Sequence, residues 1–294
     1  MTLPLAAPER VQTILLPYDG SEPSALAVPV AARLANRLGA DIHLISTVAK
    51  EEDEEERAAE LVTVERGPAL AGRVVACTVA VDLDPAGEIH EALRRLPDAV
   101  VCMGTHGRGR SAALIGSVAS DVIARGHDPV VLVGPFVGDD PRHRASDYRG
   151  ILACVDETPA SAAILPIAAR WSHLLDEPLK VATVAEPVPP SARADVVEHR
   201  RFGPAGDVTA FLARVVEPLE DAGEHVEAIA VFDPISPADG IVLYTEENPA
   251  WMLTVSSHAR QGISRLVFGS VAADIVHRSR APVLVVPRPD SRPS

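Results

Sequence analysis

The sequence predicts an α/β fold in which two doubly wound domains follow one another, each built on a five-stranded parallel sheet. Three observations predict this fold. Apolar runs of strand length alternate with helical patterns along the 294 residues. The same order of segments occurs twice. Hydrophobic residues make up 47% of the chain but aromatic residues only 3%, so the core must be aliphatic, which suits buried parallel strands.

The first half contains five strand-like segments separated by helical ones. The first strand runs into Tyr18-Asp19-Gly20-Ser21, and Gly39 is a stop signal for the helix that follows. The acidic run 51–56 is too charged to be buried and indicates a solvated loop or the start of a helix. The strands are expected at 11–17, 42–48, 73–81, 99–103 and 130–133, and the helices at 25–38, 86–96 and 117–125.

The second half repeats this order, with one alanine-rich helix expected between Thr158 and His173. The polar segment 136–148 is the expected linker, which predicts domains at 1–140 and 141–294. Four ordered matches indicate an internal duplication. They are Asp19 with Asp156 (137 residues apart), Asp84 with Asp233 (149), His106 with His258 (152) and Pro129 with Pro282 (153). The second set of strands is expected at 151–155, 179–184, 228–232, 251–255 and 283–286.

Composition excludes several classes of function. The formal net charge is -14, with 41 acidic and 27 basic residues, which argues against a non-specific nucleic-acid-binding surface. No apolar stretch has the length needed to span a bilayer, and the N-terminus lacks the pattern of a secretion signal. The 3 cysteines form no CxxC pair, so neither a disulfide framework nor a zinc site is indicated. The chain is therefore expected to act in the cytoplasm, without nucleic acid or membrane.

The candidate site lies where the strands end, because ligands of doubly wound sheets collect at the carboxyl ends of the strands. In the first half, Asp19 follows the first strand, a glycine-rich loop begins at Gly104 after the fourth, and Gly116-Ser117 opens a helix. Glycines let backbone N–H groups approach a phosphate, and a helix N-terminus favours an anion. Each piece alone is more often a turn or a helix cap. Their joint occurrence favours a phosphate site.

These residues resemble the universal stress protein family, and specifically its tandem-domain members. The family signature is Gly-x2-Gly-x9-Gly-Ser/Thr after the fourth strand, with an aspartate at the end of the first. The first half departs from it in having eight residues between Gly107 and Gly116. The second half keeps nine, but Ser256 and Ala259 replace the leading glycines. If those positions need positive φ, a Cβ is costly there, and the second loop is expected to differ from the first. The matching segments are 14–21, 103–109, 116–119 and 129–133, then 155–156, 256–260, 269–272 and 282–286.

The resemblance implies binding of ATP, with Mg as a plausible companion. Asp19 and Asp156 would accept hydrogen bonds near the adenine, Thr47 and Val184 would offer backbone contacts to the base, and Arg108 and Arg260 would pair with phosphate. The candidate site residues of the first half are Pro17, Tyr18, Asp19, Thr47, Met103, Gly104, His106, Gly107, Arg108, Gly116, Ser117 and Val118. Those of the second half are Asp156, Val184, Ser256, His258, Ala259, Arg260, Gly269, Ser270 and Val271.

The resemblance also implies that the last strands of the two halves pair antiparallel, which makes the chain an intrachain pseudo-dimer. A further homodimer through another face stays open. The leading hypothesis is an ATP-binding stress-response or signalling module that acts through conformation or an unknown protein partner. The sequence lacks a P-loop, a dinucleotide fingerprint and a kinase signature, and neither His106 nor His258 has a recognisable nucleophile partner. Hydrolysis is therefore expected to be slow at most. The alternatives are a scaffold of the same fold without nucleotide and, third, an adenylate-handling enzyme.

Overall fold

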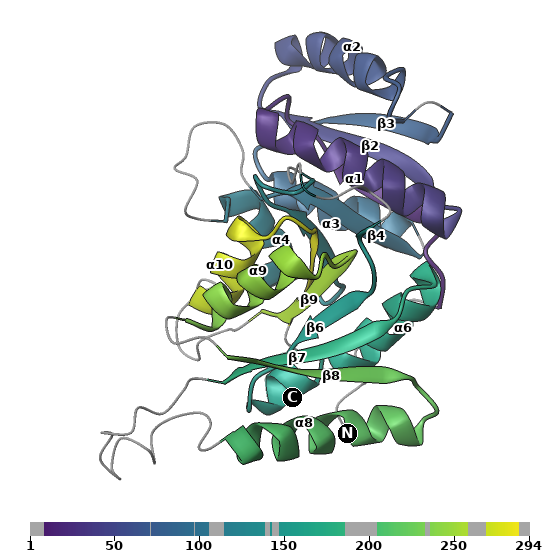
Figure 1. The fold of residues 1–294 in the computed structure, drawn as a ribbon. Helices are drawn as coiled ribbons and strands as arrows, with labels where there is room; N and C mark the ends of the chain where they lie inside the picture. The colour runs from purple at the N-terminus through teal and green to yellow at the C-terminus, as the bar shows by residue number, and fades with distance from the viewer. Residues whose placement is uncertain are drawn as a thin grey trace, which may run out of the picture.

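The fold is two α/β halves joined through one continuous sheet (Figure 1). The structure is a computed structural model, and it describes residues 9–70, 72–96, 98–105, 115–138, 142, 147–185, 205–232, 236–257 and 269–287. The predicted boundary between residues 140 and 141 lies outside these ranges and stays a prediction.

The first half follows the predicted order, with its boundaries set by local capping. Ser21 caps α1 by accepting the backbone N–H of Ser24, and Gly39 ends it in the left-handed conformation with φ 65°. The acidic run forms a short 3-10 helix and the first turn of α2, and its residues are exposed as expected. The elements are β1 (Thr13–Pro17), α1 (Glu22–Leu38), β2 (Asp41–Val48), η1 (Glu51–Asp53), α2 (Glu54–Glu65), β3 (Val74–Val81), α3 (Pro85–Arg95), β4 (Ala99–Gly104), α4 (Ser117–Arg125) and β5 (Val130–Val133).

The second half has the same order with one difference. A single helix is expected between Thr158 and His173, but the structure has a short α5 and a separate α6, with Pro166 in the first turn of α6. The one-helix prediction is therefore wrong. The elements are β6 (Ile151–Cys154), α5 (Pro159–Ala162), α6 (Leu165–Leu175), β7 (Leu179–Ala185), α8 (Ala205–Asp221), β8 (Val226–Phe232), α9 (Pro237–Glu247), β9 (Met252–Ser256), α10 (Ser270–Arg278) and β10 (Val283–Val286).

The ten strands form one sheet in the order β3-β2-β1-β4-β5-β10-β9-β6-β7-β8. Pairing is parallel within each half and antiparallel between β5 and β10, where Val131 lies opposite Leu284. These two residues stand 153 positions apart, the offset that relates Pro129 to Pro282. The centre of the junction therefore joins equivalent positions, as a two-fold axis requires. The predicted tandem fold and pseudo-dimer are confirmed.

Helices cover both faces of the sheet, and the two halves share both cores. On one face, buried residues of α1, α2, α6 and α8 pack together against the strands. On the other face, α3, α4, α9 and α10 do the same. Figure 1 shows α1 and α6 along one side of the sheet, with α2 next to β3 and α8 next to β8. Neither half therefore completes its core alone.

A charged contact joins the halves on the side of α1 and α6. The Arg37 Nη2 donates to Glu177 Oε1 at 2.7 Å, and its Nε donates to the Leu175 carbonyl at 2.7 Å. The Glu177 side chain is only 2% exposed, and its other oxygen accepts the Gly150 N–H at 2.9 Å. The positions equivalent to Arg37 and Glu177 hold Leu174 and Ala40. The contact therefore occurs on one side of the pseudo-dimer only.

A backbone contact joins the halves next to the central strands. A Cβ built on Gly134, the residue after β5, would come within 2.2 Å of the Val276 carbonyl in α10. The equivalent residue after β10 is Pro287. Glycine is therefore required here because a helix of the other half lies directly against the chain.

Acidification is expected to destabilise the fold through two half-buried histidines. Burial lowers the pKa of His43 and of His90, and for His90 the neighbouring Arg125 and Arg94 lower it further. The Nε2 of His90 is buried without a hydrogen-bond partner among the described residues. Since the folded state favours the neutral ring, the stability present above the unfolded-state pKa, about 6.5, is lost as the pH falls through the lower folded-state pKa.

The N-cap of α3 is Asp84 and that of α9 is Ser236, so α3 and α9 correspond with an offset of 152 residues, not the 149 that the match of Asp84 with Asp233 predicts. The change that tests the histidine is therefore His90→Val, because the equivalent position in α9 holds Val242. We expect the urea midpoint of the native protein to decrease when the pH is lowered from 7.5 to 5.5. The midpoint of the variant should decrease less over the same interval. Equal pH dependence of the two proteins would show that His90 contributes nothing.

Within the described ranges, no helix has the length and apolar character needed to cross a membrane.

Candidate functional site

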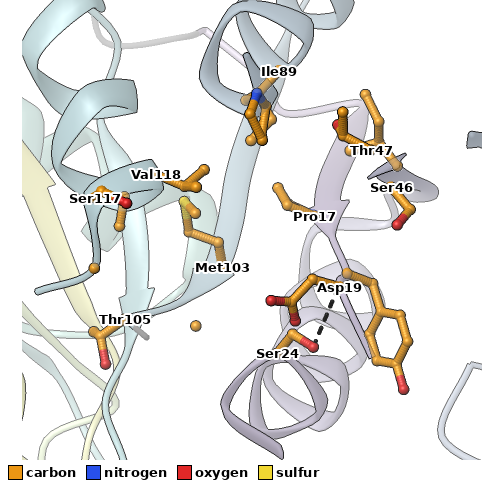
Figure 2. Close-up of a pocket in the computed structure, with 16 residues that line it drawn as sticks. Pro17, Asp19, Ser24, Ser46, Thr47, Ile89, Met103, Thr105, Ser117 and Val118 are labelled. Carbon is orange, nitrogen blue, oxygen red and sulfur yellow. Dashed lines mark hydrogen bonds between the residues drawn. The ribbon is translucent and has the colours of Figure 1, made fainter. Parts of the chain in front are cut away.

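A pocket lies at the carboxyl ends of β1, β2 and β4, with α3 and α4 on its other side (Figure 2). Its accessible volume is about 200 Å³. This is the corner at which doubly wound sheets bind ligands. The lining residues are Pro17, Tyr18, Asp19, Ser24, Ile45, Ser46, Thr47, Pro85, Ile89, Met103, Gly104, Thr105, Gly116, Ser117, Val118 and Ala119.

Asp19 is fixed at the end of β1 by a network of local hydrogen bonds. Its Oδ1 accepts the Ser21 N–H at 3.0 Å and also the Ser21 hydroxyl. The Asp19 N–H donates to Ser24 Oγ at 3.4 Å. In Figure 2 the carboxylate points from the end of β1 toward the space between β1 and β4. A carboxylate is thus held at the pocket without depending on a ligand for its position.

The wall of the pocket is apolar, and hydroxyl groups stand among the apolar side chains. Ile45, Ile89 and Met103 are each at most 5% exposed and line it from β2, α3 and β4. Thr47 and Ser117 add hydroxyl groups from opposite sides in Figure 2. Ligand sites that take a flat heterocycle combine such apolar walls with a few oriented polar groups.

Ser46 presents an unsatisfied polar atom beside this wall. The residue is 3% exposed, and its Oγ has no hydrogen-bond partner within the described part of the chain. Thr183, its equivalent in the second half, is 1% exposed and lacks a partner for its Oγ1 in the same way. Buried hydroxyl groups are rarely left unpaired, because desolvation without a hydrogen bond costs about 1–3 kcal/mol.

The N-terminus of α4 closes the pocket on the side of β4. The Thr105 N–H donates to the Val133 carbonyl at 3.1 Å, and the Gly116 N–H donates to the Thr105 carbonyl at 2.6 Å. Gly116 is the N-cap of α4 and offers no side-chain cap. No described side chain caps the first N–H groups of the helix, which are placed to receive an anion that the helix dipole also favours.

Tyr18 connects the pocket to α2. Burial raises the pKa of the Tyr18 phenol, and the nearby Glu60 carboxylate raises it further. Glu60 is held in turn by Arg57, whose Nη1 donates to it at 2.7 Å. The Tyr18 phenol therefore lies in the electrostatic field of a charged pair on α2.

Many of the predicted first-half residues come together around the pocket. They are Pro17, Tyr18, Asp19, Thr47, Met103, Gly104, Gly116, Ser117 and Val118. His106, Gly107 and Arg108, and likewise His258, Ala259 and Arg260, lie outside the described residues, so their roles stay predictions. The sequence reasoning missed other lining residues, among them Ser46, Pro85, Ile89 and Thr105. The Asp84-Pro85 helix start, which follows the third strand, could have indicated Pro85 and Ile89.

The structure gives Gly104 a role beside the predicted approach to a phosphate. The sequence argument considered a positive φ at this position only as a condition, and Gly104 is not among the residues with positive φ. A Cβ at this position would instead come within 2.3 Å of the Pro23 carbonyl in the first turn of α1. The condition of positive φ is therefore not met at Gly104. Glycine is needed because two backbone segments touch.

The second-half corner keeps the turn but has Val155 and Val184 in place of Tyr18 and Thr47. Asp156 Oδ1 accepts the N–H and the hydroxyl of Thr158 at 2.9 and 2.6 Å, and the Asp156 N–H donates to Ser161 Oγ at 2.7 Å. Ser256 takes the place of Gly104, and no side chain in the described part of the chain caps the N-terminus of α10 at Gly269. The other predicted residues, Val184, Ser270 and Val271, lie at the matching places on β7 and α10.

Comparison with known proteins adds the family. The model of the universal stress protein family matches residues 10–134 and again 147–287. The chain belongs to this family. A universal stress protein of Mycobacterium bovis is 27% identical over 196 residues, which cover 63% of this chain and 61% of that protein. The chain thus matches only about three fifths of the length of such relatives.

A solved structure of a universal stress protein shares the fold. One from Archaeoglobus fulgidus covers 94% of this chain and 98% of its own length, with a TM-score of 0.65 and 22% identity. A shorter universal stress protein, solved in complex with cAMP, covers 48% of this chain and 97% of its own length, with a TM-score of 0.38 and 26% identity. Among the described residues, no group of three or more His, Cys, Asp or Glu side chains is placed to hold a metal ion.

Proposed function

We propose that the first-half pocket binds an adenine nucleotide, ATP in the first instance, and that the chain is a stress-response or signalling module. The observation that carries this proposal is one pocket in which an apolar wall, a fixed carboxylate and a helix N-terminus that no described side chain caps meet. A purine is flat and apolar on its faces but polar at its edge. A nucleotide adds an anion at a fixed distance from its base.

Each part of the pocket has a task in this proposal. The wall of Ile45, Ile89 and Met103 takes the faces of the base, and Asp19 accepts a hydrogen bond from its amino group or from the ribose. The N-terminus of α4 at Ser117 receives the phosphates. Mg would come with the phosphates rather than through a cluster of protein ligands.

The module is proposed to act through conformation or through a partner, not through turnover. The described part of the pocket offers Asp19 as its carboxylate, and Asp19 is engaged in the turn with Ser21. A general base must reach the nucleophile it activates. Hydrolysis of bound ATP is therefore proposed to be slow at most. Binding at Tyr18 is proposed to affect α2 through Glu60.

Asp19→Asn tests the nucleotide proposal. The variant keeps an oxygen that can accept from Ser21, so the turn can form, but the negative charge is lost. We expect at least about tenfold weaker binding of labelled ATP with Mg, equal to about 1.4 kcal/mol. Equilibrium dialysis measures this, together with chromatography of nucleotide released by heating the purified protein.

The matched control is Asp98→Asn. Asp98 precedes β4, at the end of that strand away from the pocket, and its Oδ2 accepts a hydrogen bond from Gln12 Nε2. This variant should leave ATP binding unchanged. If native protein releases no nucleotide on heating and binds no added ATP with Mg, the scaffold of the same fold becomes the better proposal. The altered second-half corner at Ser256 is the observation in its favour.

A further inference from the structure

We infer that the chain binds one nucleotide, in the first half, and that the second-half corner has become a structural part that holds none. This inference rests on the proposed function of the first-half pocket. It is drawn from the differences between two corners that share one fold, position by position.

The first difference is the contact between the initial helix and the fourth strand of each half. In the first half, the backbone of α1 at Pro23 lies so close to Gly104 that a Cβ there would be 2.3 Å from the Pro23 carbonyl. This contact sets the start of α1, and with it the Asp19 turn, directly beside the end of β4. Both sides of the pocket are thereby fixed to one another.

The second half cannot make this contact in the same way, because it has Ser256 in place of Gly104. Ser256 is 6% exposed, so its side chain is accommodated inside the protein. The helix above it is interrupted, as α5 ends at Ala162 and α6 begins at Leu165.

Proline alone does not explain this interruption. Pro29 and Pro166 occupy equivalent positions, yet α1 runs unbroken through Pro29. The residue beneath the first turn does differ. We therefore attribute the break between α5 and α6 to Ser256, and its position in the chain to Pro166.

The second difference is the loss of hydroxyl groups from the lining of the corner. Val155 replaces Tyr18, and Val184 replaces Thr47, so two hydroxyl groups are lost. The two valines are 6% and 9% exposed, whereas Tyr18 and Thr47 are only partly buried and line the pocket. Cys154 stands in place of Pro17, and burial raises the pKa of its thiol to about 12, so it stays neutral.

What the second corner keeps serves the fold as well as a ligand. Asp156 organises the turn after β6 through Thr158 and Ser161, just as Asp19 does through Ser21 and Ser24. The conserved geometry of this turn therefore does not require a nucleotide. Asp156 is assigned to the turn, and Asp19 to both the turn and the ligand.

The stoichiometry of the full chain tests the inference. Titration of nucleotide-stripped protein with ATP and Mg in a calorimeter is expected to give one site per chain. Asp19→Asn should remove or weaken that site at least about tenfold. Asp156→Asn, the matched variant of the equivalent turn, should leave both the number of sites and the affinity unchanged.

Photolabelling with 8-azido-ATP adds a location, and the label is expected on peptides of the first half. Two sites per chain, or a site lost in Asp156→Asn, would overturn the inference while leaving the proposed function intact. Absence of any binding to the native chain would instead overturn the proposed function, and the inference with it.

Discussion

Replacement of Gly104 by serine is expected to destabilise the protein by about 3 kcal/mol, the upper end of what overpacking typically costs. The added Cβ would meet the Pro23 carbonyl at 2.3 Å, and backbone on both sides leaves no flexible atom to yield. The first turn of α1 must then shift, and the Asp19 turn with it. We expect binding of ATP with Mg to be lost even at temperatures where the variant is fully folded.

Urea unfolding and calorimetric titration measure the two effects separately. The matched control is Ser256→Ala, which changes the equivalent residue without adding volume and should cost less than about 1.5 kcal/mol. If Gly104→Ser binds ATP as the native protein does, then the close contact between α1 and β4 has no part in forming the pocket. If stability is also unchanged, α1 can move away at no cost.

Removal of the Arg37 side chain should produce the second large effect. Arg37→Met leaves the Glu177 carboxylate, 2% exposed, without its cation. Breaking a fully buried pair costs about 3–5 kcal/mol. Because the Arg37 side chain is 42% exposed and water can reach its place, we expect about 2–3 kcal/mol. Fluorescence of Trp171, fully buried in α6, reports the unfolding.

A surface pair supplies the comparison. Arg95→Met breaks the pair with Glu91 on α3, where the side chains are 74% and 40% exposed, and should cost at most about 1 kcal/mol. The double variant Arg37→Met with Glu177→Gln should recover part of the loss, since no buried charge is then left unpaired. Equal effects of Arg37→Met and Arg95→Met would mean that the contact between α1 and α6 adds nothing beyond a surface pair.

The order of elements could be predicted from the sequence because its signals are local. Asp19 and Asp156 each follow an apolar strand and precede a hydroxyl residue that caps or turns the chain. Gly116-Ser117 and Gly269-Ser270 each open a helix. Such signals lie within a few residues of the element they determine, so one half could be compared directly with the other.

The remaining features depend on contacts between segments far apart in the chain. The close contact of Gly104 follows from the position of Pro23, about eighty residues earlier, so no local rule could indicate it. Ile89 enters the pocket only because α3 packs beside the ends of β1 and β2. Arg37 meets Glu177 across the junction of the halves. Sequence spacing alone carries no information on such encounters.

The pair formed by Arg37 and Glu177 shows what joining two copies into one polypeptide permits. In an assembly of identical separate subunits, every off-axis substitution occurs twice, so a lone arginine could never meet a lone glutamate. Here Leu174 and Ala40 occupy the positions equivalent to Arg37 and Glu177. Fusion into one chain thus allows a contact between the two halves that identical separate subunits could make only in duplicate.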